Sequence, residues 1–431
     1  MNRIVRILGI GLAALALAGC SKNKPINAPP VSGGSADFSR VASIGTSVSA
    51  GYESGGLVVH HQRKAFPYAF ARQVGAAYAI PSVTADGLPP LLQIVSLVGP
   101  VINNSGRVPG VPDNLAWPAP YNNMSVPGAV LLDVTSPARY GSPPFTFIVR
   151  TLPGTILDQV ASLNPTFVTF EMGANEVLGP GSQGSGTPVI DATTYSVLLG
   201  AALDSLQALL PGVQGALFTV PDITSLPYFT TISSRLNASG TCRAIGPRPG
   251  TLTDNDLVLL TAGPRLATGH GVPVPCGGIG DALRANEVLY ATAVDSLQTA
   301  VDGYNAAITN EASVRGWALV DLNGLLRKAA TTGFAFQGQV YTSAFVKGGL
   351  ISLDGIHPTD LAHGIIGNAL IDAVNEKYGA HIPLLNLADF ATASSSRLAP
   401  ADVALGIPVV EHAEAVYGAL FGWRGIYSPT P

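Results

Sequence analysis

Charged residues are scarce in this chain. Its 431 residues include 23 Lys and Arg and 27 Asp and Glu, which gives a formal net charge of −4 at pH 7. No cluster of Lys and Arg of the kind that neutralises phosphates occurs, so nucleic-acid binding is not indicated. With 49 Gly and 34 Pro, the composition predicts a loop-rich globular protein of one large domain or two modest ones.

Cysteine is also rare, with three in the chain. There is no CxxC and no His/Cys cluster at zinc spacing, so we expect no metal. The adjacent His60 and His61 are given no role, because paired histidines in a loop are usually solvated. At the N-terminus, Arg3 and Arg6 precede an apolar run over 7–17 that is too short to span a membrane comfortably.

The end of that run, Leu17-Ala18-Gly19-Cys20, resembles the lipobox of bacterial lipoproteins. The resemblance implies a signal peptide over 1–19, a lipid on the Cys20 thiol and a tether over 20–36. Because Ser21 follows the cysteine, it also implies attachment to the outer membrane of the cell envelope. Without the two arginines the mature chain has 21 basic and 27 acidic residues. The alternative is an ordinary secretory signal with an incidental cysteine.

In an oxidising envelope compartment, the other two cysteines, Cys242 and Cys276, are expected to form a disulfide. Both lie in a stretch over about 221–283 that is rich in Gly, Pro and Thr. We interpret this stretch as an insert folded over the sheet edge. It is either a lid that covers the substrate or a small structural excursion.

Short apolar runs alternate with segments of helical periodicity in the rest of the chain. This alternation predicts an α/β fold of three layers, with a mostly parallel sheet between helices, over residues 37–385. A C-terminal extension over 386–431 would pack on this domain. Strands are predicted at 38–44, 165–172, 215–220 and 317–322, and helices at 64–78, 195–210, 285–314 and 359–378. We expect irregular structure at 84–119 and a flexible loop at 179–186.

Polar residues follow the ends of these strands, where α/β sheets bind their ligands. Ser47 and Asn175 each follow a predicted strand, and Asp354 and His357 share a loop before the last helix. A Ser, a His and a carboxylate can form a nucleophile, its base and the group that orients the base. Rival nucleophiles are Ser43, which should lie within the strand, and Ser49. Taken alone, the Asp354 and His357 pair also fits a surface loop that caps a helix.

Four blocks in order resemble the SGNH/GDSL hydrolases, a superfamily of serine esterases and lipases. They are Gly45-Thr46-Ser47-Val48-Ser49, Val126-Pro127-Gly128, Gly173-Ala174-Asn175-Glu176 and Asp354-Gly355-Ile356-His357-Pro358-Thr359. The resemblance implies an SGNH or flavodoxin-like fold with a Ser47, His357 and Asp354 triad. It also implies an oxyanion hole formed by the N–H groups of Ser47 and Gly128 and the Asn175 amide. Two positions depart from the family pattern, because Thr46 and Glu176 stand where Asp is usual.

The sequence thus predicts an envelope-anchored serine hydrolase that cleaves carboxylic esters, of lipid or of aryl and alkyl type, without metal or organic cofactor. Acyl transfer to an alcohol could use the same residues. The alternative from another class is a non-catalytic lipoprotein of the same fold that binds lipid or glycan. A purely structural envelope protein is disfavoured by the intact Ser, Asn, Asp and His set. The partners expected are an ester substrate and the membrane, and no oligomeric state is indicated.

Overall fold

The computed structural model describes residues 31–185, 187–391, 406–413 and 416–417. Cys20, the expected signal peptide and part of the C-terminal extension lie outside these residues. In the part of the chain that is described, no helix combines the length and the apolar character needed to cross a bilayer.

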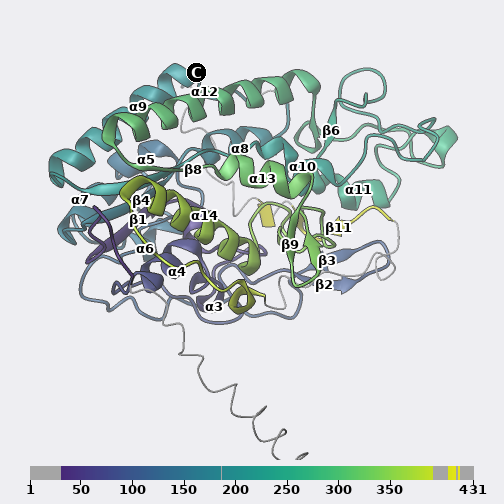
Figure 1. The fold of residues 1–431 in the computed structure, drawn as a ribbon. Coiled ribbons are helices and arrows are strands. Elements are labelled where there is room, and N and C mark those ends of the chain that lie inside the picture. Colours follow the sequence, from purple (N-terminus) through teal and green to yellow (C-terminus); the bar gives the residue numbers. More distant parts are fainter. Residues whose placement is uncertain (1–30, 186, 392–405, 414–415, 418–431) are drawn as a thin grey trace, which may run out of the picture.

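The centre of the fold is a four-stranded parallel sheet with the strand order β1-β4-β5-β8. Its strands are β1 (Val41–Gly45), β4 (Phe167–Glu171), β5 (Gln214–Phe218) and β8 (Ala318–Val320). Each lies within or beside a predicted apolar run, and helices cover both faces (Figure 1). The α/β prediction with a parallel sheet is therefore confirmed.

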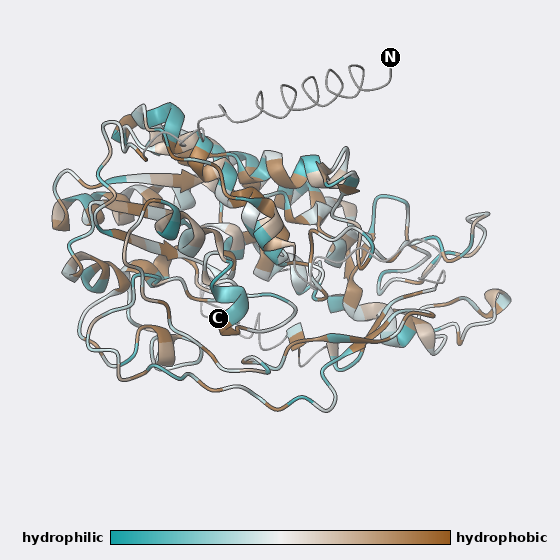
Figure 2. Ribbon diagram, turned by 60° about the horizontal axis from the view of Figure 1, so that its bottom comes forward, coloured by the Kyte–Doolittle hydropathy of each residue, from teal (hydrophilic) through white to brown (hydrophobic). Residues whose placement is uncertain are grey.

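Successive residues of each central strand pack into two different cores, as the alternation of side chains in a strand requires. In β1, Ala42 and Ile44 belong to the larger core, whereas Val41 belongs to the second core on the other face. In β4, Val168 and Phe170 face the larger core in the same way, and Phe167 the second. Because both faces are buried, most residues of these strands are apolar, and Figure 2 shows brown, apolar segments in the interior of the fold.

Three long helices and two helices of seven and eight residues supply the layers on the two faces. Those that pack into the larger core are α7 (Ile156–Ser162), α9 (Ala192–Leu209) and α12 (Ala291–Arg315). Those on the opposite face are α4 (Phe66–Gln73) and α14 (Asp360–Tyr378). Thr359 is the N-cap of α14, and its side chain accepts the Ala362 N–H. The predicted helix at 285–314 begins later, because the 3₁₀ turn η5 (Ala285–Glu287) and strand β7 (Val288–Leu289) precede α12.

Shorter elements fill the connections that sequence patterns left unassigned. The helices are α2 (Ser47–Ala50), α3 (Val59–Gln62), α5 (Leu131–Thr135), α6 (Phe145–Ile148), α8 (Ala174–Ser182), α10 (Pro227–Thr230), α11 (Gly263–Ala267) and α13 (Leu322–Ala330). The strands are β2 (Gln93–Ser96), β3 (Val101–Asn103), β6 (Leu257–Val258), β9 (Phe334–Phe336), β10 (Gln339–Tyr341) and β11 (Val409–Val410).

The stretch over 84–119 is irregular for most of its length, as expected, but it also contains the antiparallel pair β2 and β3. The expected flexible loop at 179–186 is helical up to Ser182, even though Pro180 lies inside α8. Residues 179, 181 and 182 of this helix are buried. Burial of small residues against the body of the protein thus outweighs their poor helix propensity.

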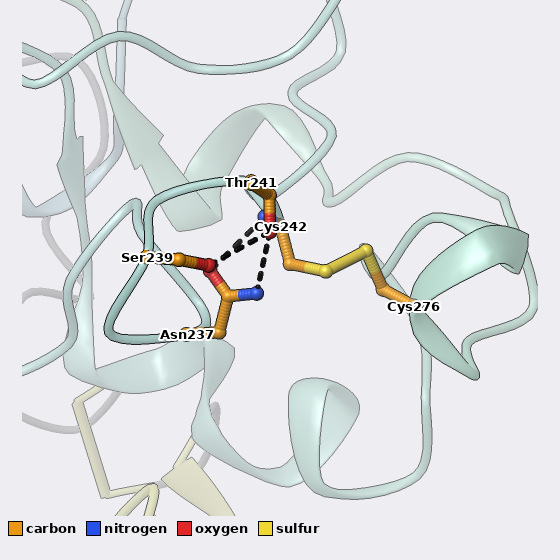
Figure 3. Close-up of a disulfide and its surroundings, with 5 residues drawn as sticks. All are labelled: Asn237, Ser239, Thr241, Cys242 and Cys276. Carbon is orange, nitrogen blue, oxygen red and sulfur yellow. Dashed lines mark hydrogen bonds between the residues drawn. A yellow bond between two sulfur atoms is a disulfide. The ribbon is translucent and has the colours of Figure 1, made fainter.

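The predicted disulfide is present and closes the insert on itself. Cys242 and Cys276 are joined with their Cα atoms 6.0 Å apart. Figure 3 shows that the loop before Cys242 has its own hydrogen bonds, including one from the Cys242 N–H to Asn237 Oδ1 at 3.1 Å. The insert also extends past its predicted end, since β6 pairs with β7.

Candidate active site

Ser47 lies where the first central strand gives way to a short helix. Strand β1 ends at Gly45, and Ser47 is the first residue of α2, so its N–H has no partner within the helix. Gly45 is required by the tightness of this turn, since a Cβ there would lie 2.5 Å from Ser49 Oγ. The Ser47 hydroxyl is thereby presented beyond the carboxyl end of the sheet.

His357 connects Ser47 to Asp354 across about three hundred residues of sequence. The His357 Nε2 atom lies 2.8 Å from Ser47 Oγ, and Nδ1 lies 2.9 Å from Asp354 Oδ2. The two distances fit a ring with its proton on Nδ1, which donates to Asp354 while Nε2 accepts the Ser47 hydroxyl. All three side chains are buried.

The Asp354 carboxylate is held by several donors besides His357. Its Oδ1 atom accepts the N–H groups of Ile356 and His357, each at 2.9 Å, and its Oδ2 atom accepts that of Gly55 at 3.0 Å. Burial alone would raise the pKa of Asp354, but the His357 ring and these hydrogen bonds lower it below its ordinary value. Asp354 is therefore an anion at neutral pH and accepts a hydrogen bond from His357 Nδ1.

The two rival serines are engaged elsewhere. Ser43 lies within β1, and its hydroxyl is bonded to the hydroxyls of Thr169 and Tyr78. Ser49 donates its hydroxyl to Glu171 at 2.9 Å. Among the three candidates, Ser47 is the one bonded to His357.

Gly128 and Asn175 lie on adjoining segments. Val126 to Ala129 form a β-turn closed by the bond from Ala129 N–H to Val126 O at 3.0 Å, with Gly128 at φ +75°. This turn needs a positive φ at its third position, which explains the Pro-Gly pair. Asn175, in the first turn of α8, donates one N–H of its amide to Ala129 O at 2.7 Å. Its second amide N–H has no acceptor among the residues that the structure describes, and Asn175 borders the same pocket as Ser47.

Glu171 contacts the Ser47 turn and was not singled out in the sequence. It is the last residue of β4, and it accepts the Thr46 N–H at 3.1 Å and the Thr46 and Ser49 hydroxyls at about 3 Å. Burial raises the pKa of Glu171, whereas these hydrogen bonds lower it, with a net rise. A carboxylate that ends an otherwise apolar strand was the signal available in the sequence.

Glu176 holds the segment after Gly128. Its Oε1 atom accepts the Leu131 N–H at 2.5 Å, while Oε2 is buried with no hydrogen-bond partner among the described residues. Burial, which outweighs the bond from Leu131, raises the pKa of Glu176 to about 7. The Glu at this position therefore ties α8 to the turn that carries Gly128.

An apolar pocket opens beside Ser47 and His357. It encloses about 790 Å³, including the part open to solvent. Its polar lining is confined to the Ser47 end, with Thr46, Asn175 and His357. The remaining wall is apolar and includes Leu178, Leu226, Leu326, Ala329, Phe334 and Ile365. Such a pocket suits an uncharged hydrocarbon group next to the Ser47 hydroxyl.

Behind this site lies a group of buried residues of metal-ligand type. Among the residues that the structure describes, Glu53, His61 and Asp360 place their ligand atoms within 4.8 Å of one another. His61 Nδ1 lies 3.2 Å from Glu53 Oε2 and 2.8 Å from Asp360 Oδ1. His61, which the sequence left without a role, therefore links the turn after α2 to the start of α14.

Replacing Glu171 tests whether its hydrogen bonds to Thr46 and Ser49 position Ser47. Glu171→Ala removes the acceptor of the Thr46 N–H, and we expect a loss of ester turnover of about 10²-fold, because small displacements of a reacting group are costly. Glu171→Gln keeps one oxygen acceptor and should lose less ester turnover than Glu171→Ala. The matched control is Asp256→Asn in the insert, which also removes a carboxylate that accepts a backbone N–H and a Thr hydroxyl. Equal effects of Glu171→Gln and Asp256→Asn on kcat would contradict the prediction.

The raised pKa of Glu176 predicts a pH dependence of stability. Between an unfolded pKa near 4.5 and a folded pKa of about 7, the folded chain holds a proton that the unfolded chain releases. The free energy of unfolding therefore falls as pH rises from 5 to 8, with up to about 3 kcal/mol from this group. Urea unfolding at both pH values should show a smaller fall for Glu176→Gln. An unchanged fall would exclude Glu176 as its source.

A family model described as GDSL-like Lipase/Acylhydrolase matches residues 41–370. No curated protein is similar enough to match the chain. Three solved structures resemble it at TM-scores of 0.35 to 0.36, too low to support an argument from shape.

The first is a putative GDSL-like lipase from Parabacteroides merdae, 11% identical over 80% of this chain and 98% of that chain, with a TM-score of 0.35. The second is an acetylxylan esterase from Geobacillus stearothermophilus, 11% identical over 79% and 96%, with a TM-score of 0.36. The third is an extracellular lipase from Streptomyces rimosus, 12% identical over 77% and 98%, with a TM-score of 0.35. Because the family model spans most of the chain, this protein belongs to the GDSL-like lipase/acylhydrolase family.

Proposed function

We propose that this protein hydrolyses carboxylic esters that carry an apolar acyl group, with Ser47 as nucleophile, His357 as general base and Asp354 as its orienting partner. The observation that carries the proposal is the continuous chain of hydrogen bonds from Ser47 Oγ through His357 to Asp354. A free hydroxyl is a poor nucleophile at neutral pH, and this arrangement supplies the base that it needs.

The proposed reaction proceeds in two halves. Ser47 Oγ attacks the ester carbonyl while its proton passes to His357 Nε2, and Asp354 stabilises the resulting imidazolium. Collapse of the tetrahedral intermediate returns that proton to the leaving alcohol and leaves an acyl group on Ser47. In the second half, His357 takes a proton from water as the water oxygen attacks the acyl carbon. The second tetrahedral intermediate then collapses, its bond to Ser47 Oγ breaks, and His357 returns the proton to Ser47 Oγ as the carboxylic acid leaves.

The negative oxygen of each intermediate needs donors that are in place beforehand. We assign this role to the N–H groups of Ser47 and Gly128 and to the second amide hydrogen of Asn175. Support comes from the unused Ser47 N–H at the start of α2 and from the bond that fixes Asn175 beside Gly128.

The pocket defines the acyl half of the substrate. Its wall is apolar away from Ser47, so an acyl chain buried there gains about 25 cal/mol for each Å² removed from water. A charged or hydroxylated acyl group would lose hydration without finding partners on that wall. We therefore propose alkyl or fatty acyl esters in preference to acetyl esters.

The proposal is tested with p-nitrophenyl esters of increasing chain length and the soluble domain that lacks Cys20. Wild type should turn over these esters, and Ser47→Ala should lower kcat by at least about 10⁴-fold. Ser43→Ala, which removes a buried hydroxyl that does not contact His357, should keep its kcat. Persistent turnover in Ser47→Ala would refute the assigned nucleophile. Inert wild type that also resists a serine-directed phosphonate would favour a lipid- or glycan-binding protein instead.

Filling the pocket should change chain-length preference. Ala329 lines the pocket, and Ala329→Leu adds three carbon atoms to its wall. We expect the ratio of kcat/KM for octanoyl over butanoyl ester to fall about tenfold, because one or two buried methylene groups are worth about that much. Ala330→Leu, at an exposed position one residue on, is the control and should keep the wild-type ratio. An unchanged ratio in Ala329→Leu would show that the chain binds elsewhere.

A further inference from the structure

The described part of the C-terminal extension, residues 406–413 and 416–417, forms a strap along one side of the protein. Its strand β11 pairs in parallel with β3. Beside this pairing, Asn103 Nδ2 donates to Glu411 Oε2 at 2.6 Å. Gly263 lies so close to the strap that a Cβ there would meet Pro408 O at 2.1 Å. The strap is thus fixed both to the 84–119 stretch and to the insert.

The end of the strap reaches the loop that carries Asp354 and His357. Tyr417 is 3% exposed, and its hydroxyl donates to the backbone carbonyl of Asp354 at 2.8 Å. Its ring meets that of Tyr228 edge-on, with centroids 4.7 Å apart. The Tyr228 N–H in turn donates to the carbonyl of Gly355 at 2.9 Å. Two successive carbonyls of the loop are therefore held from outside it.

Burial and the neighbouring groups Tyr228, Asp354 and Tyr52 raise the pKa of Tyr417 well above its ordinary value. The hydroxyl therefore keeps its proton over the whole physiological range and acts as a donor. The pocket beside Ser47 is lined by other residues, and Tyr417 is not among them. Its contact is with the acid of the proposed triad and not with the substrate.

We infer that Tyr417 is a positioning residue for ester hydrolysis: its hydroxyl fixes the Asp354 peptide and so keeps His357 directed at Ser47. The inference rests on the proposed function. Tyr417 lies beyond residues 41–370, which match the family model. The family model therefore does not cover this contact with the Asp354 loop.

The physical argument concerns what the loop loses without the hydroxyl. The Asp354 carbonyl would stay buried beside a phenyl ring without its donor, and a buried acceptor left unpaired is costly. The loop can relieve this cost by turning the Asp354 peptide, and such a turn carries the carboxylate with it. Since His357 is oriented by that carboxylate, the step most affected is proton transfer from Ser47 and not substrate binding.

The test compares Tyr417→Phe with Tyr378→Phe in the soluble domain that keeps the full C-terminus. Tyr378 is also buried, and its hydroxyl donates to the Gly215 carbonyl at 2.8 Å at the far end of α14. We expect Tyr417→Phe to lower kcat about tenfold with KM within twofold of wild type. Tyr378→Phe should lower the melting temperature at least as much and keep kcat within twofold.

Each outcome decides the inference. A kcat for Tyr417→Phe within twofold of wild type would overturn the inference. The inference would also be overturned if Tyr378→Phe lowered kcat and kcat/KM as much as Tyr417→Phe does. Asn103→Ala is a second variant, which removes the hydrogen bond to Glu411 of the strap. It should also lower kcat, by a smaller factor than Tyr417→Phe. If the wild-type protein had no esterase activity, the proposed function itself would fail. If the wild type were active and Tyr417→Phe kept its kcat, only the inference about Tyr417 would fail.

Discussion

The buried contact between His357 and Asp354 is the interaction on which the rest of the site depends. An aspartate that is 0% exposed is tolerated only if donors surround it. The loop after Ser352 supplies two backbone N–H groups, and Gly55 supplies another from the turn after α2. That turn belongs to the same segment as Ser47. Solvation of the acid by the protein therefore also brings the nucleophile to the base.

Although the chain has few charged residues, several of its carboxylates are buried near the Ser47, His357 and Asp354 site. Glu53, Glu171, Glu176, Asp354 and Asp360 are each at most 3% exposed. Glu176 and Asp354 accept hydrogen bonds mainly from backbone N–H groups of turns, whereas Glu171 accepts one backbone N–H and the hydroxyls of Thr46 and Ser49. Thr46 illustrates the arrangement: where the family usually has Asp, the carboxylate comes from the neighbouring strand instead.

The sequence predicted the parallel sheet because strands that are buried on both faces are rich in apolar residues, and it predicted α14 from the helical periodicity of residues 359–378. The sequence also predicted that four residues lie at one edge of the sheet, namely Ser47, Asn175, Asp354 and His357. Strand ends and the order of the motifs can both be recognised from residues that are neighbours in the chain. The sequence missed Glu171, His61 and Tyr417, whose contacts are all with distant residues and whose local surroundings are ordinary. The end of α8 was mistaken for a flexible loop, because the burial of its Gly and Ser residues against the body of the protein is not visible in composition.

The separation of the parts along the chain has a consequence for biosynthesis. Ser47 emerges among the first fifty residues, its base more than three hundred residues later, and Tyr417 close to the C-terminus. A nascent chain that has not yet reached His357 therefore carries a nucleophile without the group that activates it. Under the proposed function, hydrolysis of esters can begin only after His357 has been synthesised and the two distant segments have folded together.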